Sequence, residues 1–328
     1  MNRESKIFVA GGTGMVGTAI IKRLFGAGYM NIISNYFSKE PVAEHEPIIT
    51  FLKLDLTRQA EVEAFFEKER PEYIFLAAAR VGGILANSTY RADFIYKNIM
   101  IASNLIHAAY RFNATKLLNL GSSCIYPKDA PQPMKEEHLL TGPLEQTNEP
   151  YAVAKIAGIK LCRYYNEQYG TNFISVMPTN LYGPHDNFDL LNSHVLPAMI
   201  RKFHEAKERQ DKDVVELWGT GRPCREFLYV DDLADACVFL MERYGAEQIG
   251  EFVNIGTGRD LTIKELAEMI QKIIGFEGTV VWDSAKPDGT LKKLLDISRL
   301  KALGWEPRTA LEEGIRKTYE WYLTRRSK

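Results

Sequence analysis

Short apolar runs alternate with longer amphipathic segments through the first half of the chain. The short runs are rich in β-branched and aromatic residues, whereas apolar residues in the longer segments recur every three or four positions, as in helices with one buried face. Strands that alternate with helices predict right-handed crossovers and a parallel sheet covered on both faces. The predicted strands are 6–10, 31–37, 50–53, 72–76, 116–120 and 172–177, and the predicted helices are 16–25, 59–70, 93–112 and 151–169.

The alternation lapses after residue 177, where prolines and a glycine fall close together between residues 178 and 197. A second, smaller unit is therefore predicted to begin there. Thr262 and Glu265 have the spacing of a capping box, which marks the start of one of its helices. The predicted helices of this half are 195–209, 231–244, 263–274 and 311–323, and its predicted strands are 214–218, 251–255 and 279–282.

Composition and charge exclude several classes of protein. The 328 residues suffice for about two domains, and 41 basic against 42 acidic side chains leave a net charge of −1. A nucleic-acid partner is not expected without a positive field, and no apolar stretch has the length of a membrane span. The first apolar run is shorter than a signal-peptide core, and the four cysteines form no metal-binding or disulfide pattern. We therefore expect a cytoplasmic protein with reduced thiols and no metal site.

A glycine-rich loop directly follows the first predicted strand and opens the first predicted helix. Its sequence is Gly11-Gly12-Thr13-Gly14-Met15-Val16-Gly17. Glycines at positions 11, 14 and 17 allow a tight turn, a close approach to a pyrophosphate, and packing of the helix on the sheet. The free N–H groups of the helix N-terminus then face that anion. The loop predicts a dinucleotide-binding site.

The end of the second predicted strand bears on the choice of dinucleotide. NAD-specific folds usually carry an acid there that holds the ribose 2′-hydroxyl, whereas this chain has Ser34 to Lys39. Lys39 can meet a 2′-phosphate, which favours NADP, although it also fits an ordinary exposed loop lysine. Asp55, just after the third strand, has the position of an adenine contact or of a solvated strand-end carboxylate.

A candidate catalytic pair begins the helix predicted from residue 151. Tyr151 and Lys155 are spaced i and i+4, so one helix face presents both. An ammonium beside a phenol is expected to lower the phenol's pKa, which lets the tyrosine exchange protons near neutral pH. This spacing is common by chance. It becomes a signal for catalysis because Ser122 lies at the end of the preceding strand.

These features occur in the order found in extended short-chain dehydrogenase/reductases that act on nucleotide sugars, and the chain resembles the GDP-L-fucose synthase family in particular. The resemblance spans nearly the whole chain and implies a Rossmann-type doubly wound parallel sheet with a smaller C-terminal α/β substrate domain. Six motifs carry it: Leu76-Ala77-Ala78-Ala79, Val81-Gly82-Gly83-Ile84, Gly121-Ser122-Ser123-Cys124-Ile125-Tyr126-Pro127, Asn148-Glu149-Pro150-Tyr151-Ala152-Val153-Ala154-Lys155, Pro178-Thr179-Asn180-Leu181-Tyr182-Gly183-Pro184-His185-Asp186-Asn187-Phe188 and Lys286-Pro287-Asp288-Gly289.

The resemblance implies two reactions at one site: 3,5-epimerisation of GDP-4-keto-6-deoxy-D-mannose, then reduction of its C4 ketone by NADPH to give GDP-L-fucose. Cys124 matches the family's base and His194 its acid. Tyr151 would supply the proton for reduction, Ser122 would orient the oxygen, and Lys155 would bind the nicotinamide ribose. Composition alone would make Cys124 a small buried core residue.

The resemblance also implies how the ligands are divided. Residues 1–178, joined by parts of 226–256, would bind NADP, and residues 179–328 would hold the GDP-sugar; relatives are usually homodimers. Trp218 also fits a packing role, and Arg225 also fits an exposed ion pair with Glu226. Beyond the glycine loop, Lys39 and Asp55, the implied cofactor positions are Leu76, Ala77, Ala78, Tyr151, Lys155, Pro178, Asn180, Leu181 and His194, and the implied substrate positions are Lys202, Trp218, Arg225 and Asp288.

Departures from the family pattern leave alternatives open. Thr13 stands where bacterial members often carry an arginine that reaches the 2′-phosphate, and the segment 35–50 is longer, so NADPH and NADH both remain candidates. A 4,6-dehydratase would usually carry Asp-Glu in place of Ser123-Cys124, and a simple 4-epimerase would not need Cys124 with His194. No residue in the sequence distinguishes a GDP-L-fucose synthase from a GDP-colitose synthase, whose substrate lacks the C3 hydroxyl. A non-catalytic NADP-sensing regulator would typically lack Tyr151 and Lys155.

Overall fold

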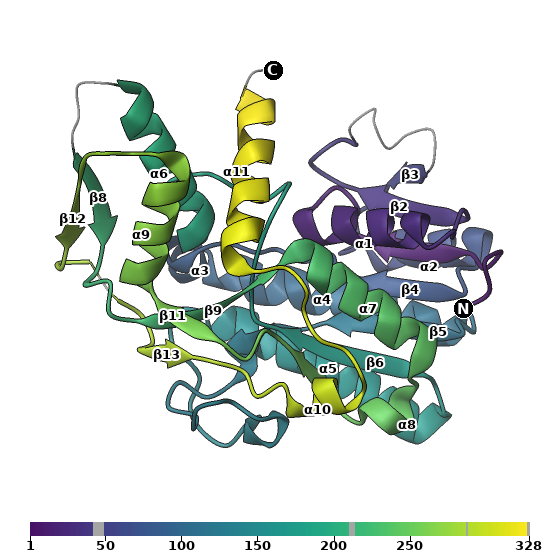
Figure 1. Ribbon diagram of the computed structural model, residues 1–328. Coiled ribbons are helices and arrows are strands. Elements are labelled where there is room, and N and C mark those ends of the chain that lie inside the picture. The colour runs from purple at the N-terminus through teal and green to yellow at the C-terminus, as the bar shows by residue number, and fades with distance from the viewer. Residues whose placement is uncertain (42–48, 210–213, 287, 327–328) are drawn as a thin grey trace.

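The core of the molecule is a seven-stranded parallel sheet. The computed structural model describes residues 1–41, 49–209, 214–286 and 288–326. The strand order β10-β6-β5-β4-β1-β2-β3 reverses between β1 and β4, which is the doubly wound Rossmann-type arrangement (Figure 1). The fold class predicted from the sequence is thereby confirmed. The strands are β1 (Ile7–Ala10), β2 (Ile32–Tyr36), β3 (Thr50–Lys53), β4 (Tyr73–Leu76), β5 (Lys116–Leu120), β6 (Phe173–Pro178) and β10 (Val253–Ile255).

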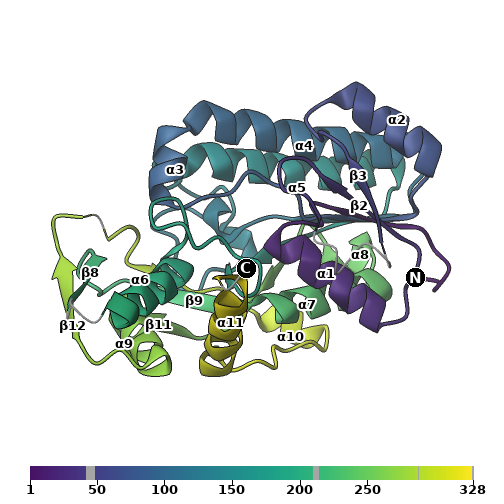
Figure 2. The same ribbon diagram turned by 90° about the horizontal axis from the view of Figure 1, so that it is seen from above.

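Helices cover both faces of this sheet, as Figure 2 shows from above. Successive side chains of a strand point to opposite faces, so both faces of a buried parallel strand must be apolar. In β1, Ile7 and Val9 pack in one core with α1 and α7, whereas Phe8 and Ala10 pack in a second core with α2 and α4. The covering helices are α1 (Met15–Gly26) and α7 (Val230–Arg243) on one face, and α2 (Gln59–Glu69), α4 (Arg91–Arg111) and α5 (Glu149–Tyr169) on the other.

A smaller layered region lies beside the large sheet (Figure 1). Two small sheets pack with three helices around a separate apolar core that includes Phe203 and Leu266. The capping box is confirmed: the Glu265 amide donates to Thr262 Oγ1, and the Thr262 amide donates to Glu265 Oε2. The elements are β7 (Asn180–Tyr182), β8 (Val214–Trp218), β9 (Cys224–Tyr229), β11 (Asp260–Thr262), β12 (Thr279–Asp283), β13 (Lys292–Lys293), α6 (Val195–Arg209), α9 (Ile263–Ile274) and α11 (Leu311–Arg326).

Several short elements were not predicted from the sequence. Strands of two or three residues, such as β7, β11 and β13, are too short to show a period, and β9 mixes charged with apolar residues at its start. The other short elements are the helices α3 (Ile84–Thr89), α8 (Ala246–Ile249) and α10 (Ser298–Ala302) and the 3₁₀ turns at Ser123–Ile125 and Glu136–His138. Within the described residues, no helix has the length and apolarity of a membrane span.

Candidate active site

The predicted site residues meet where the parallel strands end. The glycine loop follows β1, Ala77 follows β4, Ser122 follows β5, and Pro178 ends β6. The carboxyl ends of parallel strands lie at one edge of the sheet, and a crevice forms where the strand order reverses. Here that reversal falls between β1 and β4, beside the glycine loop.

The glycine loop is a close-packed cradle that side chains would fill. Gly11 has φ +85°, and a Cβ there would come within 2.8 Å of the Ala78 Cα. A Cβ on Gly17 would come within 2.1 Å of the Gly11 carbonyl oxygen. Gly14, the N-cap of α1, offers no side-chain cap, so the first N–H groups of the helix face the open loop. The loop therefore fits a dinucleotide pyrophosphate.

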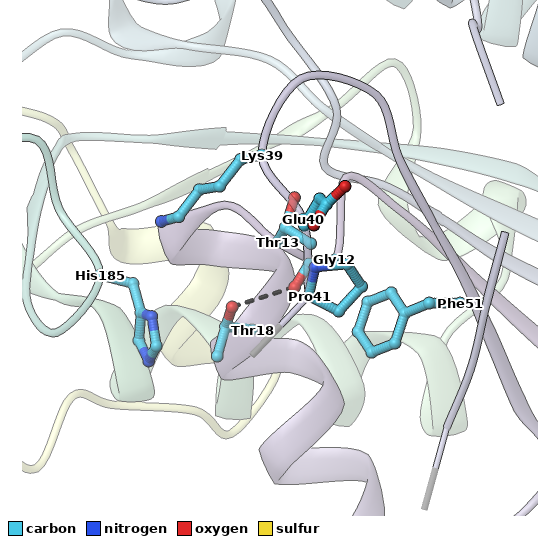
Figure 3. A pocket seen from close by; sticks show the side chains of 8 residues that line it. All are labelled: Gly12, Thr13, Thr18, Lys39, Glu40, Pro41, Phe51 and His185. Atoms are coloured by element: carbon cyan, nitrogen blue, oxygen red, sulfur yellow. Dashed lines mark hydrogen bonds between the residues drawn. The ribbon is translucent and has the colours of Figure 1, made fainter. Parts of the chain in front are cut away.

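Figure 3 shows a small pocket beside this cradle, at the end of β2. Glu40 and Pro41 lie beside Gly12 and Thr13 in this view, Lys39 extends toward the side of His185, and Phe51 lines the other side. Burial and the nearby Arg325 lower the pKa of Lys39, so the positive charge of Lys39 faces another cation there. Two neighbouring cations form an arrangement that a phosphate group can neutralise. The long segment 35–50 includes residues 42–48, which lie outside the described part of the chain.

The other predicted cofactor positions have well-defined partners. Asp55 accepts hydrogen bonds from the amide and hydroxyl of Thr57, so its carboxylate also shapes its own turn. The Ala77 amide donates to the Ala10 carbonyl, which fixes the segment Leu76 to Ala78 against the loop. Asn180 donates to the backbone carbonyl of residue 226 and thereby ties Pro178 to Leu181 to β9. Met15 and Val16 form the first turn of α1.

Ser122, Tyr151 and Lys155 lie together, as their order along the chain predicted. The Ser122 hydroxyl hydrogen-bonds the Tyr151 side chain, and the Lys155 Nζ lies 5.7 Å from the Tyr151 ring centroid. Lys155 is only 8 % exposed and donates to the Leu120 carbonyl at 2.7 Å. Burial lowers the pKa of this amine to about 8.

The expected lowering of the Tyr151 pKa is wrong. Burial and the neighbouring Cys124 raise the pKa of this phenol, and the hydrogen bond to Ser122 offsets this only in part. The physical reason is desolvation, which disfavours the charged form of both groups: it raises the pKa of the Tyr151 phenol and lowers the pKa of the Lys155 amine. Tyr151 is therefore a protonated hydrogen-bond donor.

Cys124 faces the same group of side chains. It is a free, partly exposed cysteine and not a fully buried core residue, so the alternative based on composition is wrong. Cys124 interacts electrostatically with Tyr151 and Lys155 and with Arg225 of β9. The Asn148 side-chain amide donates to its Sγ at 3.4 Å. One site thus holds a thiol, a phenol and two cations.

His194 directly precedes α6 and is exposed to solvent, although desolvation by the surrounding protein lowers its pKa. The segment before His194 contacts the glycine pair 82–83, which in turn packs near Tyr151 through Phe94. The Gly83 amide donates to the Asn192 carbonyl, and a Cβ on Gly82 would come within 3.3 Å of Phe94. Phe94 in turn packs edge-to-face on Tyr151.

The four predicted substrate positions form a chain of neighbours that leads to Cys124. The Lys202 Nζ lies 5.9 Å from the ring of Trp218, which is 43 % exposed and therefore not a core packing residue. The next two residues, Gly219 and Thr220, pack on Asp288, whose carboxylate accepts from the Thr220 amide and hydroxyl. Asp288 and Cys124 both interact electrostatically with Arg225.

Sequence reasoning missed Glu226, which it treated only as a surface partner of Arg225. Glu226 is 0 % exposed, and its carboxylate accepts hydrogen bonds from the Thr257, Gly258 and Leu295 amides. The proposed exposed ion pair is therefore wrong. No signal in the sequence marks this role, because the three donors come from distant segments.

The fold, the nucleotide cradle and the Ser-Tyr-Lys group define a dinucleotide-dependent enzyme of the reductase and epimerase type. The chain belongs to the NAD dependent epimerase/dehydratase family, whose model matches residues 7–256. It is 56 % identical to GDP-L-fucose synthase 1 of Arabidopsis thaliana, with 98 % of this chain and 94 % of the relative covered. It is 52 % identical to GDP-L-fucose synthase of Escherichia coli strain K12, with 98 % and 97 % covered. The resemblance based on the motifs is confirmed.

A solved structure supports the comparison of folds. A GDP-mannoheptose C4 reductase from Campylobacter jejuni, with NADP bound, superposes with a TM-score of 0.87 at 40 % identity. The alignment covers 98 % of this chain and 99 % of that chain. The similarity extends beyond the cofactor-binding half, because the family model ends at residue 256 whereas the alignment with this structure covers 98 % of the chain.

Proposed function

We propose that this protein converts GDP-4-keto-6-deoxy-D-mannose to GDP-L-fucose by 3,5-epimerisation and NADPH-dependent reduction at C4. The observation that carries the proposal is the position of Cys124, which shares one site with Tyr151, Lys155 and Arg225. A reductase site alone needs no base next to the sugar ring, whereas epimerisation does, and the thiol beside the phenol can serve as that base. A regulator would need neither.

The epimerisation follows from the acidity of the carbons beside the ketone. The Cys124 thiolate removes a proton from such a carbon and becomes a thiol, while the electron pair passes to the C4 oxygen as an enolate. Hydrogen bonds from Ser122 and Tyr151 stabilise that oxygen. His194 donates a proton to the opposite face, and its lowered pKa makes the imidazolium a stronger acid. Cys124 then loses its proton to solvent and His194 takes one up, so the same cycle can repeat at the second of the carbons C3 and C5.

The reduction uses the same polarised carbonyl. NADPH, when bound, would supply the hydride that C4 accepts. Tyr151 gives its proton to the resulting alkoxide, and the raised pKa of this phenol keeps the proton in place until then. Lys155 would bind the nicotinamide ribose, and its ammonium group places a positive charge beside Tyr151. The glycine cradle and Lys39 hold the pyrophosphate and the 2′-phosphate.

The GDP-sugar would lie along the chain of neighbours in the smaller region. Arg225 and Lys202 bind the diphosphate, because guanidinium and ammonium groups make strong charge-assisted hydrogen bonds to phosphate. Asp288 accepts hydrogen bonds from the nucleotide or sugar. Trp218 offers an exposed ring to the ligand. Arg225 faces both Asp288 and Cys124, so it would set the sugar next to the thiol.

Solvent exchange separates the two steps. In D₂O without NADPH, the wild type should incorporate deuterium at C3 and C5 of GDP-4-keto-6-deoxy-D-mannose. Cys124→Ser should slow this exchange by roughly 100-fold or more, because positioned general bases contribute about that factor. Tyr151→Phe should lose NADPH oxidation but only slow the exchange, because Ser122 can still donate to the enolate oxygen. Wild-type exchange in Cys124→Ser would remove the base role.

Product identity is the second readout. With NADPH, product NMR should give GDP-L-fucose stereochemistry. Turnover only of a substrate without the C3 hydroxyl would instead support the GDP-colitose reaction. No cofactor oxidation with either substrate would support a regulator.

We propose that the protein acts as a cytoplasmic homodimer joined through α4 and α5. These helices pack against each other, and their outer side exposes apolar and aromatic side chains that a partner would cover: Tyr96 is 61 % exposed, Tyr164 52 % and Val153 38 %. Four free cysteines fit a reducing compartment. Light scattering of the wild type should give twice the chain mass, and Tyr96→Lys should lower it.

A further inference from the structure

Asn148, the residue before α5, uses its side chain in an unusual way. It occupies the N-cap of α5, and its carbonyl accepts the first backbone hydrogen bond of the helix from the Ala152 amide. Asparagine is favoured at this position because its side chain normally caps the free amides of the helix. Here the side chain makes no such cap. Its Nδ2 donates instead to the Cys124 Sγ at 3.4 Å.

The other polar groups around Cys124 have hydrogen bonds directed elsewhere. The Lys155 ammonium donates to the Leu120 carbonyl, and the Arg225 guanidinium donates to the Cys224 carbonyl. Both cations attract a negative sulfur through space, and Tyr151 faces it as a neutral phenol. The Ser122 Oγ accepts from the Cys124 amide. The Asn148 amide is thus a directional donor to the sulfur, and the two cations supply undirected attraction.

We propose that Asn148 is a positioning residue that stabilises the Cys124 thiolate and fixes its direction. An N–H group donates to a thiolate more strongly than to a thiol, so the contact favours the charged form. The Asn148 Oδ1 is buried and has no hydrogen-bond partner in the described part of the protein. Within that part, the oxygen of this side chain therefore does not hold it to another group. The catalytic meaning of this contact rests on the proposed base role of Cys124.

Alkylation by iodoacetamide tests the contact without any substrate, because only the thiolate reacts. The rate at Cys124 is followed against pH by peptide mass spectrometry, with partly exposed Cys224 in the same molecule as the internal reference. Asn148→Ser keeps a good N-cap residue but removes the amide. We expect the midpoint of its Cys124 profile to rise by about one pH unit, a roughly tenfold loss of thiolate at neutral pH.

Asn148→Asp is the matched variant, because it keeps the size and capping ability of the side chain while replacing the donor by a carboxylate. Its Cys124 midpoint should rise further than that of Asn148→Ser, and the Cys224 profile should stay unchanged in both. Unshifted Cys124 midpoints in both variants would overturn the inference, and so would a downward shift in Asn148→Asp.

The same variants distinguish the inference from the proposed function. If Cys124 is the base, deuterium exchange at neutral pH should slow in Asn148→Ser by the same factor as alkylation and recover at higher pH. A shifted alkylation midpoint with unchanged exchange would support the contact and reject the base role. An unshifted midpoint rejects the contact whatever the enzyme does.

Discussion

At the scale of single residues, Lys155 should set the alkaline limit of the reductase. Burial lowers the pKa of this amine to about 8, so it is an ammonium below that pH and loses its charge as the pH rises through it. The pKa of Tyr151 is raised, so the phenol is still protonated in that range. We expect kcat/KM for NADPH oxidation to fall as the pH rises through about 8. Lys155→Arg should move this fall upward, because a guanidinium stays charged. A wild-type rate that stays constant to pH 10 would contradict this assignment.

The residues of this group illustrate what a sequence can and cannot predict. The i, i+4 spacing of Tyr151 and Lys155 predicts a shared helix face, and the two side chains do lie together. The direction of the Tyr151 pKa was predicted wrongly, because spacing reveals a neighbouring charge but not how deeply the pair is buried. Asn148 was missed for a related reason. Its contact with Cys124 exists only once α5 has packed beside the end of β5.

At the scale of elements, regular periodicity was the decisive signal. The bounds of β3, β5, β8, α6 and α9 match their predictions. For α9, the capping box at Thr262 and Glu265 marks the first turn of the helix. The predicted strands that became β4 and β6 differ from the structure by one residue. The missed strand β9 carries Arg225 and Glu226 in succession, and alternation sends one to the site and the other into the core.

The end of β2 and the C-terminal part of α11 should together select NADPH. Lys39 follows β2 and interacts electrostatically with Arg325 of α11, while the His185 ring packs at a tilt on Trp321 of the same helix. Lys39 lines the same pocket as Thr13, so two neighbouring cations lie close to the cofactor loop. We expect Lys39→Ala to raise KM for NADPH roughly tenfold, the worth of one charge-assisted hydrogen bond to phosphate. KM for NADH, which lacks the phosphate, should stay unchanged. Equal changes in both would indicate a structural role.

At the scale of the whole molecule, Glu226 connects the two layered regions. Its backbone lies in β9 of the smaller region, and its carboxylate binds the Thr257 and Gly258 amides just after β10 of the large sheet. Its carbonyl oxygen accepts from Asn180, next to the cofactor crevice. One buried carboxylate therefore connects segments of both regions, and the sequence could not reveal this connection because its partners lie far from Glu226 along the chain.

This connection can be tested by comparing two replacements of Glu226. Glu226→Ala leaves the Thr257, Gly258 and Leu295 amides without their acceptor inside the protein. We expect the free energy of unfolding to fall by about 3 kcal/mol or more, because each buried unpaired donor costs about 1–3 kcal/mol. Glu226→Gln keeps one acceptor oxygen and should lose less. Glu277→Ala, at an exposed position, should change the free energy by under about 0.5 kcal/mol. Urea unfolding measures all three, and equal stability of Glu226→Ala and wild type would show that the carboxylate does not hold the two regions together.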